Sequence, residues 1–118
     1  MSAFQKYGLT ILRIGLAILY LWFGFSQLFD GLNWVSWVPA WAVALAHMPP
    51  AMIVLGNGLF EVAMGSLLAL GLWVRPVSFI LAAHMALVTF DIGLTAIGMR
   101  DLTIAFSTLA LGFLNERE

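Results

Sequence analysis

The stretch LTILRIGLAILYLWFGFSQLF, residues 9–29, is apolar along almost its whole length and decides the fold of this chain. At about 1.5 Å per residue, a helix of this length covers about 30 Å, the thickness of the hydrocarbon core of a bilayer. Lys6 and Gly8 precede the stretch, and Asp30 and Gly31 follow it. Residues 9–29 are therefore predicted to form a membrane-spanning helix.

Three further apolar stretches occupy about residues 52–74, 77–96 and 101–114. The last is short for a full span, so this helix either starts earlier, tilts within the bundle or meets a thinner bilayer. Residues 33–50 are rich in tryptophan, whose indole ring prefers the boundary between lipid and water, and this segment is predicted to lie in the membrane interface. The predicted fold class is an all-α membrane protein. It is a single domain over residues 1–118, a four-transmembrane-helix bundle with a short interfacial helix between the first and second spans.

The composition agrees with a membrane protein. Hydrophobic residues make up 63% of the chain and charged residues only 9%, whereas a soluble domain carries roughly 25% charged residues. The net charge of -1 provides no basic patch for nucleic acid. Since there is no cysteine, disulfides, thiolate metal sites and covalent haem attachment are excluded.

The basic residues predict the orientation of the chain in the membrane. Four of the five fall on or near one side of the predicted bundle: Lys6, Arg13, Arg75 and Arg117. Arg100 falls on the other side, and the loop of residues 30–50 contains no Lys or Arg. The positive-inside rule then places both termini in the cytoplasm and this loop outside. We expect a prokaryotic plasma (inner) membrane.

Several polar side chains fall inside the predicted spans, where an ionisable group costs at least ~2.5–3.5 kcal/mol and needs a partner or a function. From their depths, Arg13, Glu61 and His84 are expected to share an inner polar layer. A second layer nearer the outer face is expected to contain Gln27, Asn57, Asp91, Arg100 and Asp101.

The spacing of these residues predicts which helix faces point inward. Arg13, Tyr20 and Gln27 are seven residues apart, so they line one stripe of the first helix. Asn57 and Glu61 are four residues apart and share a face of the second span. Each polar stripe is expected to face the interior of the bundle.

Two interpretations remain open for several of these side chains. Arg13 either reaches the interface as a topology anchor or pairs with Glu61. Glu61 lies too deep to reach water, and is either a structural carboxylate or a functional one. His84 is expected to hydrogen-bond within the bundle, with no metal or haem site predicted. Asp91 and Arg100 are expected to form an ion pair at the outer rim.

The order of these residues is similar to that of a known family. The pieces that carry the similarity are Leu12-Arg13-Ile14-Gly15-Leu16, Trp22-Phe23-Gly24-Phe25, residues 57–71 around Glu61, and Arg100-Asp101-Leu102. The chain resembles the DoxX family of small four-helix integral membrane proteins. That family takes its name from a subunit linked to thiosulfate oxidation with quinone as acceptor. Members that use cysteines find no counterpart here, so the resemblance does not extend to thiol chemistry.

Three functions are consistent with these features. The first is an accessory subunit of a larger membrane complex for electron transfer or respiration, not catalytic on its own. Its partners would be lipids and either other membrane-protein subunits or a second copy. The second is a quinone-linked oxidoreductase membrane subunit, with Glu61, His84 and Tyr20 in a quinone slot. The third is transport of a small molecule or lipid.

Overall fold

A computed structural model describes residues 1–115, and within them the secondary structure is entirely helical. The elements in chain order are α1 (Ala3–Phe29), the 3-10 helix η1 (Gly31–Trp37), α2 (Ala40–Ala46), α3 (Pro50–Leu70), α4 (Val74–Ile92) and α5 (Ala96–Leu114). The four long helices, α1, α3, α4 and α5, are each long and apolar enough to cross a membrane. The predicted all-α class with four spanning helices is confirmed.

Helix caps account for the ends that the hydrophobic pattern placed differently. α1 begins at Ala3, well before residue 9, because Ser2 and Gln5 form a capping box that satisfies free backbone N–H groups. α5 begins at Ala96 instead of residue 101, because the Thr95 side chain accepts a hydrogen bond from the backbone N–H of Gly98 at 3.0 Å. α5 thus has 19 residues and is long enough to span.

Three other boundaries also moved. Pro50 opens α3, two residues before the predicted start at residue 52, since proline at the first helical position gives up no hydrogen bond. Gly71, with a φ of 75°, ends α3 in the left-handed conformation that glycine adopts freely. α4 then begins at Val74, three residues before the predicted start at Val77.

The tryptophan-rich connection forms two short helices where one was expected. η1 and α2 are separated at Val38 and Pro39, both extended, with Pro39 at the N-cap of α2. Proline has no backbone N–H and cannot continue the hydrogen-bond ladder from η1. We call residues 31–46, which contain η1 and α2, the cap segment.

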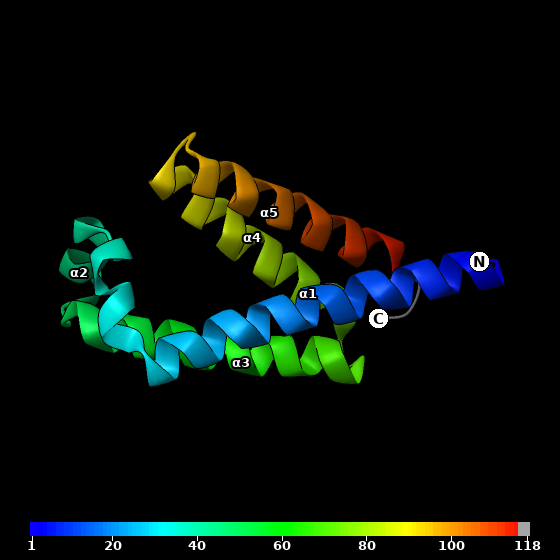
Figure 1. Cartoon of the computed structure of the whole chain (residues 1–118), viewed down its shortest axis with the longest axis horizontal. Coiled ribbons are helices and arrows are strands. Elements are labelled where there is room, and N and C mark those ends of the chain that lie inside the picture. The colour runs from blue at the N-terminus through cyan, green and yellow to red at the C-terminus, as the bar shows by residue number, and fades with distance from the viewer. Residues whose placement is uncertain (116–118) are drawn as a thin grey trace.

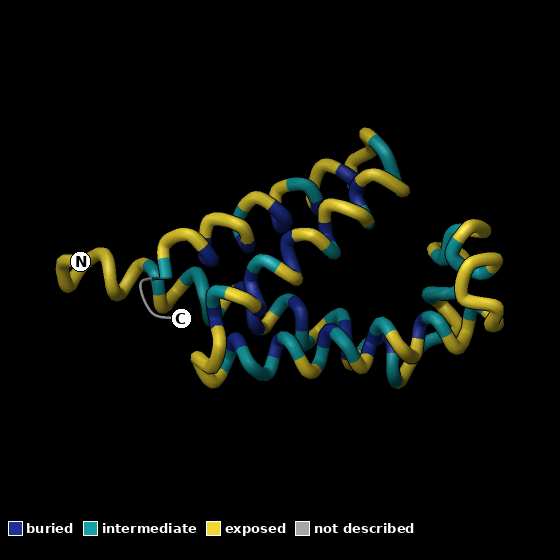
Figure 2. Tube along the Cα trace, turned by 180° about the vertical axis from the view of Figure 1, so that it is seen from behind, coloured by how far each residue is buried: buried dark blue, intermediate teal, exposed yellow. Residues whose placement is uncertain are grey.

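The four long helices are arranged as two pairs, α1 with α3 and α4 with α5 (Figure 1). The pairs converge at the end that carries the N-terminus and the α3–α4 connection, and diverge toward the cap segment (Figures 1 and 2). We call these the closed end and the open end. The largest buried side chains, including Tyr20, Leu68, Leu81 and Leu111, form a core where the pairs meet.

Glycine allows α1 and α3 to approach each other closely. A Cβ atom added at Gly24 would lie 2.9 Å from the backbone nitrogen of Val62 and 3.0 Å from the backbone oxygen of Gly58. A Cβ added at Gly58 would lie 3.0 Å from the backbone oxygen of Gly24. Small residues at a helix crossing are the usual means of close packing in membranes. The α1–α3 pair is therefore tightly packed, and the α4–α5 pair diverges from it toward the open end.

Candidate functional site

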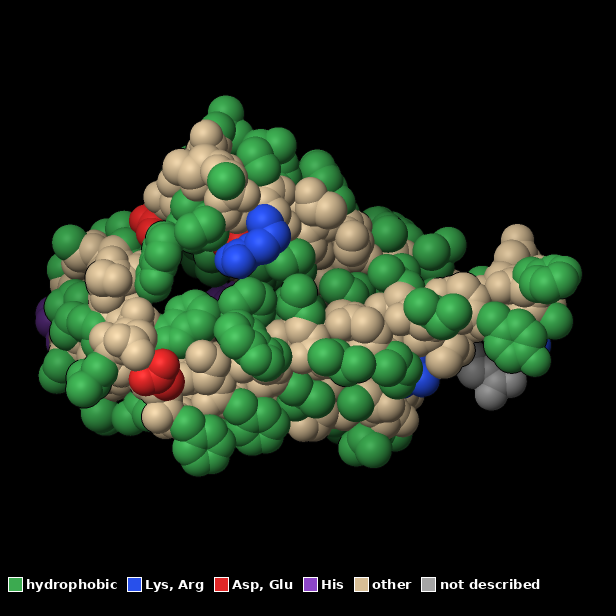
Figure 3. All heavy atoms as spheres, in the orientation of Figure 1, with side chains coloured by type: hydrophobic (Ala, Val, Ile, Leu, Met, Phe, Trp, Pro, Cys, Tyr) green, Lys and Arg blue, Asp and Glu red, His purple; other side chains and the backbone are tan. Residues whose placement is uncertain are grey.

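A cavity of about 400 Å³ lies between the two helix pairs at the open end. Figure 3 shows a hollow in a largely hydrophobic surface, with a basic side chain at its edge. Five aromatic side chains contribute to its walls: Trp22, Phe23, Trp34, Trp37 and Trp41. Ligand pockets usually measure about 300–1,000 Å³ and combine apolar walls with a few polar groups. This cavity is large enough for a small ring-shaped ligand.

Glu61 of α3 and His84 of α4 face each other in the wall of the cavity. Glu61 Oε1 lies 3.4 Å from His84 Nε2, and the Glu61 side chain is only 6% exposed. Glu61 Oε2 and His84 Nε2 are buried and have no hydrogen-bond partner among the described residues. The ring of Phe60 packs at 5.1 Å from the imidazole. Two unsatisfied polar atoms thus lie together in a mainly apolar cavity.

A second polar pair extends the site toward α1. Asn57 Nδ2 donates a hydrogen bond to Gln27 Oε1 at 2.8 Å and a longer one to Glu61 Oε1 at 3.3 Å. Gln27 is buried at the contact between α1 and α3. The Asn57–Gln27 pair therefore holds Oε1 of the Glu61 carboxylate, whereas Oε2 receives no hydrogen bond from it.

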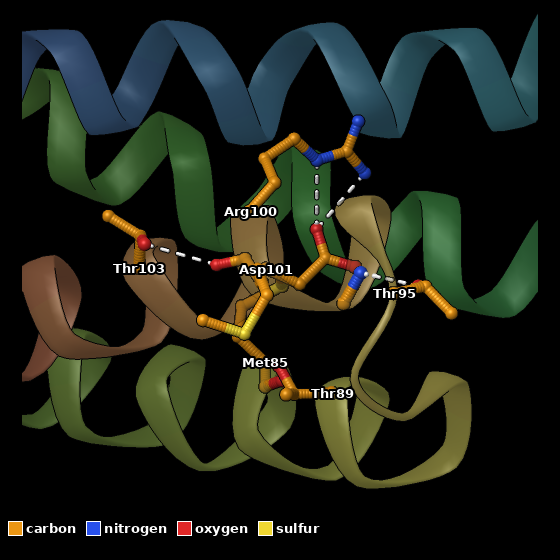
Figure 4. Close-up of polar contacts among 8 residues, drawn as sticks. Met85, Thr89, Thr95, Arg100, Asp101 and Thr103 are labelled. Atoms are coloured by element: carbon orange, nitrogen blue, oxygen red, sulfur yellow. Dashed lines mark hydrogen bonds and ion pairs between the residues drawn. The ribbon is translucent and has the colours of Figure 1, made fainter.

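Arg100 and Asp101 of α5 form the opposite wall. Arg100 donates to Asp101 Oδ1 from Nε at 3.1 Å and from Nη2 at 3.0 Å (Figure 4). Asp101 is buried, and in Figure 4 it lies between Arg100 and the part of α4 that carries Met85 and Thr89. The Arg100 guanidinium lies 5.4 Å from the centre of the Phe23 ring of α1, in a cation–π contact. Arg100 therefore bridges the two helix pairs at the edge of the cavity.

At the open end, the cap segment is bonded to both helix pairs through two indole hydrogen bonds. Trp34 Nε1 donates to Ser26 Oγ at 3.0 Å, and Trp41 Nε1 donates to Asp91 Oδ1 at 3.3 Å. The expected ion pair between Asp91 and Arg100 is wrong: Asp91 is exposed and bonds the cap, whereas Arg100 pairs with its neighbour in α5. The second polar layer is therefore divided between the cavity wall and its rim.

Comparison with known families agrees with this architecture. A family model described as DoxX matches residues 8–94, well over half of the chain. The chain belongs to the DoxX family. No curated protein and no solved structure matches it. The matched residues include Glu61 and His84 but stop before α5, so the similarity suggested for Arg100 and Asp101 lies outside the match.

Arg13 of this DoxX protein does not belong to the inner layer. Its guanidinium donates to the backbone oxygens of Leu68 and Ala69, near the end of α3. Leu68 is seven residues beyond Glu61, about 10 Å along the helix. Of the two interpretations left open for Arg13, the pairing with Glu61 is therefore not the one that this structure shows. The last carbonyls of a helix carry partial negative charge and attract the cation.

Tyr20 of this DoxX protein does not line the cavity either. It is completely buried, and its hydroxyl forms a 2.8 Å hydrogen bond with Thr108 Oγ1 of α5. Tyr20 lies seven residues from Gln27 on the same stripe of α1, where the helix pairs have already converged. Tyr20 is therefore not available to a quinone in this cavity, because its hydroxyl joins α1 to α5.

The cap tryptophans are the site residues of this DoxX protein that sequence reasoning assigned elsewhere. Trp34, Trp37 and Trp41 were expected to anchor the interface, yet all three line the cavity. Their density within residues 34–41 was the available signal. Among the described residues, no three His, Asp or Glu side chains are placed to hold a metal ion.

Proposed function

We propose that this DoxX protein is an accessory membrane subunit that holds a lipid-soluble quinone between its two helix pairs. The complex it serves would be an electron-transfer or respiratory assembly of a prokaryotic plasma membrane. Electrons would come from a partner subunit, because the proposed role of this chain is to bind and orient the quinone. The observation that carries the proposal is the mainly apolar cavity with unsatisfied Glu61 and His84 atoms inside it.

The cavity suits the chemistry of a quinone head group. A quinone is a flat apolar ring with an oxygen at each end, and it needs apolar walls with polar groups at fixed points. Indole and phenyl rings from Trp22, Phe23 and Trp34 supply flat surfaces. Glu61 and His84 are groups that bind and exchange protons, which a quinone takes up when it is reduced.

The accessory role rests on the outer surface of the helices. Large apolar side chains such as Ile18, Phe90 and Phe106 are exposed in the isolated chain. In the most apolar 18-residue stretch of each spanning helix, at most 39% of the residues are buried within the chain. These faces are available to lipid and to a neighbouring subunit.

The proposal is tested by purifying the protein from its native membrane and measuring bound quinone by chromatography of the organic extract. A matched pair of variants locates the binding: Ile53→Trp fills the cavity, whereas Ile80→Trp adds the same side chain on an exposed face. We expect quinone with the wild type and with Ile80→Trp, and about tenfold less with Ile53→Trp. Absence of quinone from the wild type, or equal retention by both variants, would contradict the proposal.

The accessory role needs a separate measurement. Crosslinking in native membranes followed by mass spectrometry should join this chain reproducibly to a redox-active membrane subunit. Crosslinks restricted to copies of the chain itself would replace the accessory role with a homo-oligomer.

A further inference from the structure

We infer that the cavity selects the hydroxyl-bearing, reduced form of its ring ligand through the free oxygen of Glu61. The inference rests on the proposed function and specifies it, because it states which redox form the site holds more tightly. A hydroquinone, whose oxygens carry protons, is the preferred ligand over the corresponding quinone.

The first observation is the uneven bonding of the Glu61 carboxylate. Oε1 accepts a hydrogen bond from Asn57 and faces His84, whereas Oε2 is buried without a partner among the described residues. The residue as a whole is 5% exposed and lines the cavity. A buried acceptor without a donor is unfavourable, so a ligand group that donates to Oε2 gains what the protein itself does not supply.

The second observation is that several of the hydrogen-bond donors around the cavity already have acceptors. The Asn57 amide donates to Gln27, and Arg100 donates twice to Asp101. The indole N–H groups of Trp34 and Trp41 donate to Ser26 and Asp91. A ligand that only accepts hydrogen bonds must compete for these donors, whereas a ligand that donates meets a free acceptor.

The chemistry of the two redox forms then decides the preference. A carboxylate can only accept, and so can the carbonyl oxygen of a quinone, so these two groups repel each other. The hydroxyl of a hydroquinone donates to the carboxylate in a charge-assisted hydrogen bond, which is stronger than a neutral one. His84 Nε2 lies beside Oε1 and is also unpartnered, so it can contact the same hydroxyl.

The chain contains its own reporter for the test. Trp22, Trp34, Trp37 and Trp41 line the cavity, whereas Trp73 lies in the α3–α4 connection at the closed end. A Trp73→Phe background confines the tryptophan fluorescence to the cavity. Quenching by tetramethylbenzoquinone and, under anaerobic conditions, by tetramethylhydroquinone gives the two dissociation constants in detergent-purified protein. The dimethyl ether of the hydroquinone keeps a similar ring and cannot donate.

We expect the hydroquinone to bind about tenfold more tightly than either the quinone or the dimethyl ether. Glu61→Gln replaces one carboxylate oxygen by an amide that donates, so it should lower or reverse this preference. Ser78→Ala is the matched control, because Ser78 is a buried polar residue without a partner in the described chain but does not line the cavity.

The outcomes separate the two proposals. If none of the three probes binds the wild type, the proposed quinone site itself is overturned. If the quinone and hydroquinone bind equally, or if Glu61→Gln leaves a clear preference unchanged, only the selection by Glu61 is overturned. The comparison with the dimethyl ether requires no variant, so the inference stays testable even if Glu61→Gln does not fold.

Discussion

Arg13 and Arg75 make the same kind of contact in the two helix pairs. Arg13 of α1 donates to the backbone oxygen of Ala69 at 3.0 Å, near the C-terminus of α3. Arg75 of α4 donates to the backbone oxygen of Gly112 at 3.1 Å, near the C-terminus of α5. The last carbonyls of a helix lack partners within the helix and carry partial negative charge. Each pair is thus fastened at the closed end by an arginine from its first helix.

The two pairs also share a sequence at this place. Residues 66–72 read SLLALGL in α3 and its C-terminal turn, and residues 107–113 read STLALGF in α5. Toward the open end the likeness disappears, since α3 carries Asn57 and Glu61 whereas α5 carries Arg100 and Asp101. The pairs are therefore similar where they pack together and different where they enclose the cavity.

Removing the Arg13 guanidinium should destabilise the closed end. Arg13→Ala leaves the Ala69 carbonyl without its side-chain donor and the Leu68 carbonyl with only the backbone N–H of Gly71, and we expect a loss of ~1–3 kcal/mol in the free energy of unfolding. Arg13→Lys should lose less, because it keeps the charge without the planar fork. Unfolding in detergent measures both, with Lys6→Ala on the exposed first turns of α1 as the control. Equal stability of Arg13→Ala and Lys6→Ala would refute the role assigned to this contact.

The close α1–α3 crossing predicts a second stability difference. Gly58→Ala places a methyl group 3.0 Å from the backbone oxygen of Gly24, so the helices must separate, at a cost of ~1–3 kcal/mol. Gly15→Ala meets nothing within 4 Å and should be neutral or slightly stabilising, because alanine favours helix. Thermal unfolding of the two variants side by side checks the crossing, which would be wrong if both behaved alike.

Sequence periodicity predicted the polar faces but not their environments. Arg13, Tyr20 and Gln27 lie on one stripe of α1, as their spacing requires. Because the helix pairs diverge, this stripe runs from a helix end, through a packed crossing, to the amide pair beside Glu61. A seven-residue period fixes the face of one helix and contains no information about the angle to its neighbours.

The sequence did not predict that the cap segment lines the cavity, again because the local pattern contains no tertiary information. Tryptophan at a membrane boundary and tryptophan that lines a cavity have the same local sequence signature, so Trp34 and Trp41 were assigned only to the interface. Their indole hydrogen bonds to Ser26 and Asp91 depend on tertiary structure. The start of α5 was different, since Thr95 followed by Gly98 carried a local capping signal.

The orientation predicted from the basic residues can be measured directly, because the chain has no cysteine. Ala3→Cys and Ser36→Cys introduce single thiols at exposed positions near the closed end and in the cap segment. The positive-inside rule predicts that an impermeant thiol reagent added outside intact cells labels Ser36→Cys and spares Ala3→Cys. Cells opened before labelling provide the control that both thiols are reactive, and labelling of Ala3→Cys alone from outside would reverse the assignment.

The facing of Glu61 and His84 predicts an unequal pair of single substitutions. His84→Leu leaves the Glu61 side chain, which is only 6% exposed, in the cavity without the imidazole that faces it. Glu61→Leu leaves the imidazole of His84, which is 22% exposed, so the remaining polar group is less costly to keep in the cavity. His84→Leu should therefore destabilise the chain more than Glu61→Leu does.

The double variant completes the comparison. Replacing both Glu61 and His84 by leucine removes the two unsatisfied polar atoms together, and replacing a whole buried pair by apolar groups is often neutral. We expect the double variant to be more stable than His84→Leu, with a coupling energy of about 0.6–1.7 kcal/mol, the range that double-mutant cycles give for polar contacts between helices in membranes. Unfolding in detergent at neutral pH gives all four free energies of the cycle. If the losses in unfolding free energy of the two single variants add up to that of the double variant, the 3.4 Å approach of the two side chains contributes nothing to the stability of the fold. A coupled pair that the fold tolerates losing would instead mean that these polar groups are kept for the ligand.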